Sequence, residues 1–140
     1  MTPKQIELVE NSWDFVLMNT TEAGIIFYNR LFEIDPSLRT LFKGDIKSQS
    51  QKLVSLITFA VHKLNSLDEI LSDVKALGMR HNKYHVKEEH YATVAQALLW
   101  TLEKGLGDRW NEELKNAWVT LYTVLSKTMI AAAKEEKVMA

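Results

Sequence analysis

The sequence contains no cysteine, only two prolines and only five glycines among its 140 residues. Without cysteine, disulfides, thiolate zinc sites and cysteine nucleophiles are excluded, and the composition fits a reducing compartment. No apolar run approaches the roughly 20 residues that a membrane-spanning helix needs, and the first residues lack the apolar core of a secretion signal. We therefore expect a cytoplasmic protein that does not enter a membrane.

The chain also lacks a strong charge of either sign. Its 17 basic and 18 acidic residues leave a net charge of -1, which gives no field to attract nucleic acid or an anionic membrane. Apolar residues at 46% and charged residues at 25% are typical of a soluble globular protein. The length suits one core, and no linker, repeat or low-complexity stretch divides it, so we expect a single domain over residues 1–140.

The apolar residues recur at spacings of three and four, as amphipathic helices require, and alternating runs are almost absent. Thr2 and Gln5 form a capping box around Pro3, and Asp35-Pro36 repeats a cap followed by proline. The sequence predicts an all-α domain, and the unequal helix lengths argue against a regular four-helix bundle. The expected helices are about 3–18, 20–34, 36–42, 48–64, 67–82, 87–105 and 110–134, followed by a solvated tail.

Three polar side chains fall on apolar stripes of three different expected helices: Tyr28, Gln49 and His81. Taken singly, each has an ordinary explanation, because core tyrosines, glutamines at a stripe edge and buried histidines usually find a partner in the protein. Together they favour a cavity between helices that holds a group needing one nitrogen ligand and two hydrogen-bond partners.

Three of the four histidines lie within ten residues, which raises the alternative of a zinc site. His81 and His85 are four positions apart, as in HExxH metalloproteases, but Asn82 stands where that motif has its catalytic glutamate. His90 follows two glutamates in the expected first turn of a helix, where a solvated position is the ordinary expectation. A three-histidine zinc site is therefore the weaker hypothesis.

Five motifs, in order, resemble those of the globins. They are Phe27-Tyr28-Asn29-Arg30-Leu31-Phe32, then Asp35-Pro36 with Leu41-Phe42, then Gln49-Ser50-Gln51-Lys52-Leu53, then Leu77-Gly78-Met79-Arg80-His81, and finally Trp118 with Tyr122. The resemblance covers essentially the whole chain, and it is strongest to the bacterial single-domain globins and the haem domain of flavohaemoglobins. It implies a globin fold of about seven helices that encloses a pocket for haem b.

The resemblance also implies roles for individual residues. His81 would be the proximal ligand of the iron, and Tyr28 and Gln49 would be the distal pair. Phe42 and Leu53 would form walls of the pocket, and Val86 would lie on the proximal side.

Three further positions complete the implied site. Lys52 and His85 match places where globins often put groups near the haem propionates, and Tyr91 matches a tyrosine that supports the proximal histidine in flavohaemoglobins. Those proteins also have a supporting glutamate on the last helix, and Ala133 occupies that position here.

Three functions follow as alternatives. The first is reversible, high-affinity binding of dioxygen or another diatomic such as nitric oxide or carbon monoxide, for transport, storage or sensing. The second is a nitric oxide dioxygenase in which Tyr28 and Gln49 would be catalytic; it would need a separate reductase, because no flavin or nicotinamide domain and no GxGxxG motif are present. The third is a helical interaction domain without haem.

Overall fold

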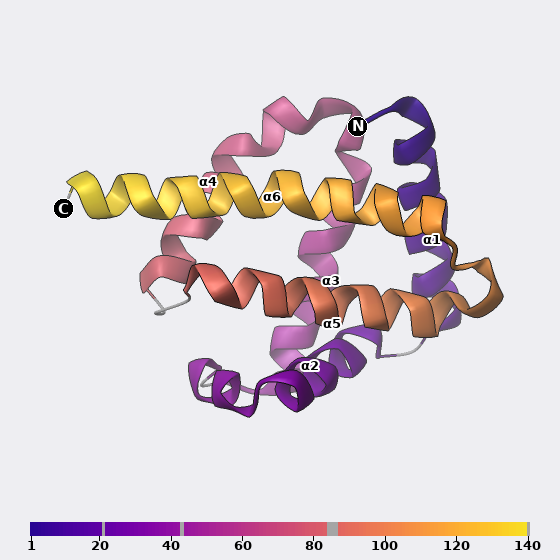
Figure 1. Cartoon of the computed structure of the whole chain (residues 1–140), viewed down its shortest axis with the longest axis horizontal. Helices are drawn as coiled ribbons and strands as arrows, with labels where there is room; N and C mark the ends of the chain where they lie inside the picture. The colour runs from indigo at the N-terminus through magenta and orange to yellow at the C-terminus, as the bar shows by residue number, and fades with distance from the viewer. Residues whose placement is uncertain (21, 43, 84–86, 140) are drawn as a thin grey trace.

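The computed structural model describes the backbone of residues 1–20, 22–42, 44–83 and 87–139, but not the side chains of residues 67, 68, 81–83, 133 and 135–139. Six α-helices and three short 3-10 helices make up this part of the chain, and it contains no strand (Figure 1). The prediction of an all-α fold is confirmed. The helices are α1 (Pro3–Asn19), α2 (Ala23–Ile34), η1 (Pro36–Leu41), α3 (Ile46–His62), η2 (Leu64–Ser66), α4 (Leu67–Lys83), α5 (Glu88–Leu106), η3 (Gly107–Arg109) and α6 (Glu112–Met139).

The capping signals in the sequence operate as expected. Gln5 N donates to Thr2 Oγ1 at 3.1 Å, and Thr2 N donates to Gln5 Oε1 at 3.0 Å, so the capping box at the start of α1 is complete. Asp35 Oδ1 accepts from Ser37 N at 3.1 Å at the start of η1. Gly107 ends α5 with a φ of 55°, a backbone angle that glycine adopts without steric cost.

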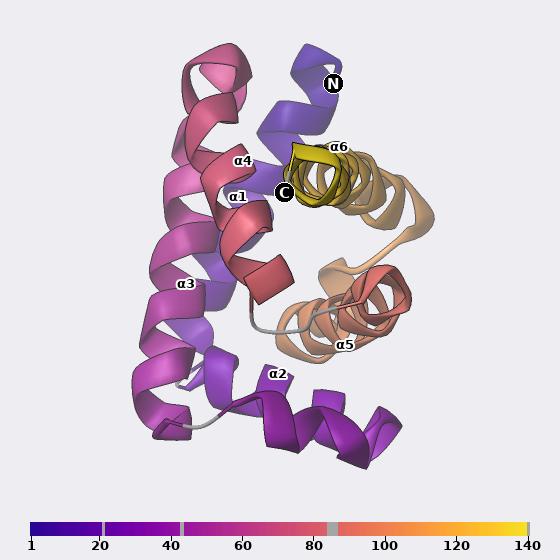
Figure 2. The same cartoon turned by 90° about the vertical axis from the view of Figure 1, so that its left-hand side faces the viewer.

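Figures 1 and 2 show the arrangement of the helices from perpendicular directions. Helices α5 and α6 run side by side in Figure 1, joined by η3, and α3 crosses behind them. In Figure 2, α5 and α6 are seen nearly end-on, with α3 and α4 beside them and α2 below. No helix in the described part of the chain is long and apolar enough to cross a membrane.

Two helix crossings depend on glycine. A methyl group at Gly24 of α2 would lie 2.8 Å from Ser50 Cβ of α3, and one at Gly78 of α4 would lie 2.4 Å from the backbone oxygen of Met129 in α6. Both distances are far below van der Waals contact, so each glycine lets two helices approach more closely than any side chain would allow. Gly78 thereby fixes the position of the helix that carries His81.

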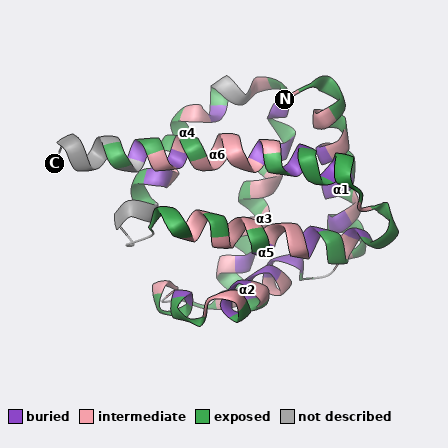
Figure 3. Cartoon of the chain, viewed as in Figure 1, coloured by how far each residue is buried: buried purple, intermediate pink, exposed green. Residues whose placement is uncertain are grey.

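The largest buried cluster joins α1 to α3 and α6 (Figure 3). Trp13 and Trp118 meet edge to face with their ring centroids 5.9 Å apart. Trp118 Nε1 donates to Ser12 Oγ, and Trp13 Nε1 donates to Thr58 Oγ1, each at 2.9 Å. Because both indole N–H groups have partners, the two rings can be buried without the cost of an unpaired donor.

Candidate functional site

A cavity of about 300 Å³ lies between α3, α4, α5 and α6. Its walls are mostly apolar and include Leu53 and Ile57 from α3, Leu77 from α4, Val94 from α5 and Leu125 from α6. At one side the lining includes exposed residues of α4, among them Asp73 and Arg80, so the cavity opens to solvent there. An apolar cleft with a few polar groups at its mouth is typical of a site for a small molecule or cofactor.

Beside this cavity, the ring of Tyr28 is buried in a cluster of aromatic side chains. The ring centroid of Tyr28 lies 5.0 Å from that of Phe27 and 5.2 Å from that of Phe42, and Phe42 lies 5.6 Å from Phe32. Phe27 lines the cavity, whereas Tyr28 and Phe42 do not. Burial raises the pKa of Tyr28 to about 12, and none of the described residues hydrogen-bonds its hydroxyl. The phenol is therefore a protonated donor that is still available.

Gln49 lies in the first turn of α3 and is half-buried. The helix begins two residues earlier than predicted, at Ile46, because Asp45 caps it by accepting from Lys47 N at 3.2 Å. Leu53, one turn after Gln49, lines the cavity, but Gln49 itself does not. Lys52 is exposed and also lies outside the lining.

Helix α4 forms a further wall of the cavity, in addition to that formed by α3. Its backbone carries His81 four residues after Leu77, which lines the cavity, and three residues after Gly78. The side chain of His81 and the whole of residues 84–86 lie outside the described residues, so the predictions for His81, His85 and Val86 stay predictions.

Two tyrosines contribute to the cavity from α5 and α6. Tyr91, predicted as a haem contact, lines the cavity, as does Tyr122. The Tyr122 hydroxyl donates to the backbone oxygen of Tyr91 at 2.5 Å. Burial raises the pKa of both phenols, and the nearby Tyr91 raises that of Tyr122 further. Both side chains therefore stay neutral at physiological pH.

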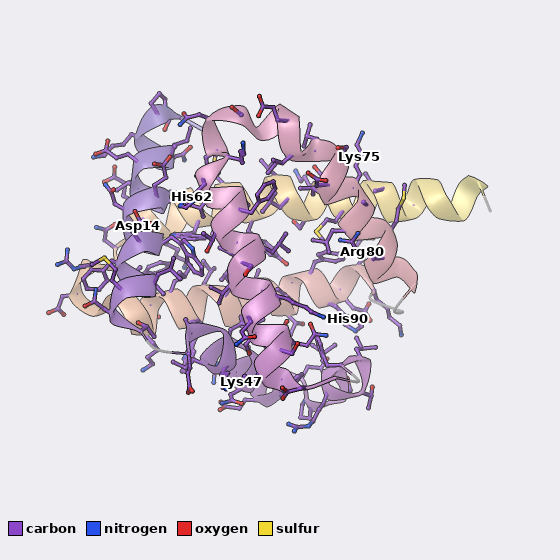
Figure 4. The ribbon with its side chains drawn as sticks, turned by 180° about the vertical axis from the view of Figure 1, so that it is seen from behind. Asp14, Lys47, His62, Lys75, Arg80 and His90 are labelled. Carbon is purple, nitrogen blue, oxygen red and sulfur yellow. The ribbon has the colours of Figure 1, made fainter. Side chains whose placement is uncertain are left out.

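His90, expected at a solvated position, is partly exposed and also lines the cavity. Its Nδ1 accepts from the backbone N–H of Lys87 at 2.9 Å, which turns the ring back over the first turn of α5. The neutral imidazole must then carry its hydrogen on Nε2. Figure 4 shows His90 and Arg80 between α3 and the end of α4, so two nitrogen donors lie at the cavity.

The model of the globin family matches residues 25–129, three quarters of the chain and every element that surrounds the cavity. The chain is a globin. The assignment rests on this match and agrees with the order of the helices around the cavity.

Similar proteins occur in several kingdoms. This globin is 29% identical to neuroglobin of Tetraodon nigroviridis, over 92% of this chain and 90% of the relative. It is 31% identical to an anaerobic nitrite reductase of Gossypium hirsutum, over 96% of this chain and 90% of the relative. The structure of a bacterial globin from Campylobacter jejuni aligns with a TM-score of 0.81 at 23% identity, covering 97% of this chain and 99% of that one, and so has the same fold.

The cavity of this globin fits the group that the family binds. Haem is a flat, mostly apolar molecule with two carboxylates at one edge, and the cavity is apolar inside with Arg80 and His90 at its lining. Leu53 and Leu77 line the cavity from the helices that carry Gln49 and His81. Sequence reasoning did not place His90 or Arg80 at the cavity.

Proposed function

We propose that this globin holds haem b in the cavity between α3 and α4 and reversibly binds dioxygen or another diatomic gas. The observation that carries the proposal is the apolar cavity itself, bounded by the helix with Gln49 on one side and the helix with His81 on the other. When bound, haem supplies an iron atom that binds diatomic gases.

His81 would hold this cofactor through an imidazole nitrogen, since neutral imidazole is a good axial ligand. Tyr91, which lines the same cavity, would support His81. Arg80 and His90 would face the carboxylate edge of the cofactor, together with Lys52 and His85 as the resemblance implies.

Tyr28 and Gln49 would hold the gas by donating hydrogen bonds. Burial keeps the Tyr28 phenol protonated, so its hydroxyl can donate over the whole physiological pH range. A net hydrogen bond contributes about 1 kcal/mol, so two donors would slow the release of a polar gas ligand about tenfold or more. High oxygen affinity is the expected consequence.

Substitution of the histidines tests the assignment of the ligand. We expect His81→Ala to lose haem, because its helix offers no other imidazole one turn from Leu77, while the control variants His85→Ala and His90→Ala retain it. The measurement is the absorption spectrum of the purified proteins in the ferric and ferrous states. Haem retention by His81→Ala would show that another residue is the ligand, and a wild-type protein that cannot be loaded with haem would favour the haem-free interaction domain.

A second candidate function is reduction of nitrite, which the 31% identity to the cotton nitrite reductase favours. Converting nitrite to nitric oxide and water consumes one electron and two protons, and His90 Nε2 carries a proton at the cavity. Ferrous protein mixed with nitrite under anaerobic conditions should then release nitric oxide. If the protein instead consumes nitric oxide catalytically in air with a reductase supplied, the dioxygenase alternative is favoured. Inactivity in both assays would leave gas binding as the only supported function.

A further inference from the structure

A second hollow, of about 360 Å³, lies on the outside of the α5/α6 pair. Its lining includes Ala92 and Ala95 of α5 and Val119, Thr123 and Ile130 of α6, together with one charged residue, Glu88, at the start of α5. We call this hollow the α5/α6 groove. Beyond Glu88, a small molecule in the groove would meet only uncharged side chains.

One layer of side chains separates the α5/α6 groove from the cavity. Four residues line both spaces: Tyr91 and Leu98 of α5, and Tyr122 and Ser126 of α6. Ser126 is small, and its hydroxyl turns back to donate to the oxygen of Thr123 in its own helix at 3.3 Å. The wall between the two spaces is therefore one side chain thick, and Ser126 has the smallest side chain of the four residues that form it.

A hydrogen bond closes this layer. The Tyr122 hydroxyl reaches from α6 to the backbone oxygen of Tyr91 in α5 at 2.5 Å, and the bond is half-buried. Breaking it frees the phenol ring to turn about its side-chain bonds, while the two helix backbones can stay in place. Side-chain rotations of this kind occur far more rapidly than helix movements.

We propose that the α5/α6 groove is a route by which uncharged diatomic gases reach the cavity, and that the Tyr122 side chain is its gate. The other opening of the cavity carries the charged side chains of Asp73 and Arg80. The groove has a charged side chain, Glu88, at the start of α5, but the four residues of the wall that it shares with the cavity are uncharged. A gas molecule with almost no polarity can cross a wall of uncharged side chains without losing strong contacts with water. The proposal rests on the gas-binding function proposed above.

A larger side chain in the shared wall, which would block the passage, tests the route. Ser126→Phe places a ring in the layer shared by both spaces, while Lys127→Phe adds the same ring at the next, exposed position of α6 and serves as the control. With haem-loaded ferrous proteins, we expect carbon monoxide to associate several-fold more slowly with Ser126→Phe and at the wild-type rate with Lys127→Phe. Equal rates in all three proteins would overturn the proposal.

Removing the hydrogen bond between the Tyr122 hydroxyl and the Tyr91 backbone oxygen tests the gate. This variant also keeps the proposal testable if Ser126→Phe does not fold. Tyr122→Phe retains the ring but loses one hydrogen bond, so the open gate should be populated about five-fold more often and carbon monoxide should associate correspondingly faster. An unchanged or slower rate would contradict a gate at Tyr122.

Xenon provides a readout that does not depend on haem. In crystals of the wild-type protein under xenon pressure, we expect xenon in both the α5/α6 groove and the cavity. In Ser126→Phe, xenon should be lost at the shared wall, and in Lys127→Phe it should bind as in the wild type. Failure to bind haem would refute the proposed function, whereas absence of xenon from the groove would refute the route.

Discussion

At the scale of single residues, the Tyr28 hydroxyl is the group with the most direct consequence for ligand binding. Tyr28→Phe keeps the ring in its aromatic cluster and removes only the hydroxyl, so we expect dioxygen to leave the haem-loaded protein about five- to tenfold faster. Because the pKa of Tyr28 is about 12, the difference should be the same at pH 6 and pH 9. Stopped-flow displacement of dioxygen by carbon monoxide measures the rate, and an unchanged rate would show that Tyr28 does not contact the ligand.

The same raised pKa links Tyr28 to stability at alkaline pH. Burial raises the pKa from its ordinary value of 10.0 to about 12, so the folded state binds the phenolic proton more tightly than the unfolded state does. The resulting stabilisation is complete below pH 10 and is lost as the pH rises from about 10 to 12. By pH 11 the loss should reach about 1.4 kcal/mol of the free energy of unfolding.

Urea unfolding of the wild type and Tyr28→Phe at pH 9 and pH 11 measures this loss. Tyr91 and Tyr122 also have raised pKa values, but they are present in both proteins, so the difference between the two declines isolates Tyr28. Parallel declines would mean that the phenol of Tyr28 ionises as easily in the folded protein as in the unfolded one.

Sequence reasoning anticipated the burial of Tyr28 but not the place of His90 at the cavity, and the reason is the range of the interactions involved. The burial of Tyr28 follows from its place on an apolar helical stripe, which the sequence displays directly. The position of His90 depends on one hydrogen bond to the backbone of Lys87 and on the distant helices that complete the cavity. Helical periodicity contains no information about either contact.

At the scale of secondary-structure elements, the crossing of α4 and α6 at Gly78 controls the helix that carries His81. In Gly78→Ala, the new methyl group would lie 2.4 Å from the backbone oxygen of Met129, and a backbone atom cannot move aside as a flexible side chain can. We expect a loss of about 1–3 kcal/mol or more in the free energy of unfolding, together with weaker haem retention because α4 is displaced.

Gly44→Ala is the matched control for Gly78→Ala, because a methyl group at Gly44 would meet no atom within 4 Å. Denaturant unfolding and haem transfer to an acceptor protein measure the two effects. If Gly78→Ala and Gly44→Ala behave alike, the close approach of α4 to α6 does not hold the proximal helix in place.

The predicted and observed helix boundaries differ at α3, α6 and η1. Asp45 caps α3 and could have located its start, but the apolar stripe begins later and directed the prediction to residue 48. Helix α6 continues to Met139, beyond the predicted end near 134, because the lysines and glutamates there are good helix formers and need no burial. The predicted helix at 36–42 is the 3-10 helix η1, Pro36–Leu41, whose hydrogen bonds span three residues instead of four.

At the scale of the whole molecule, the helices differ in how much of their packing depends on the cavity. Helix α1 belongs to the cluster around Trp13 and Trp118, and hydrogen bonds from these two indoles tie it to α3 and α6. Helix α4 packs chiefly on α6, where Ile70 and Val74 meet Met129, and its other inward side faces the cavity. The sequence showed the apolar stripe of α4 but not that its partner would be α6, because that pairing joins residues more than 50 positions apart.

This uneven packing predicts how the globin responds to loss of haem. Without the cofactor, α4 keeps chiefly its contact with α6, while α1 retains all of its contacts, so local opening of α4 should become much easier than opening of α1. Hydrogen exchange followed by mass spectrometry, with and without haem, should show a large loss of protection across Leu67–Lys83 and little change across Pro3–Asn19. Ligand binding stabilises the state that holds it, and here that stabilisation would be concentrated in one helix. An equal loss of protection in α1 and α4 would mean that haem supports the whole core, and that the tryptophan cluster is not an independent centre of stability.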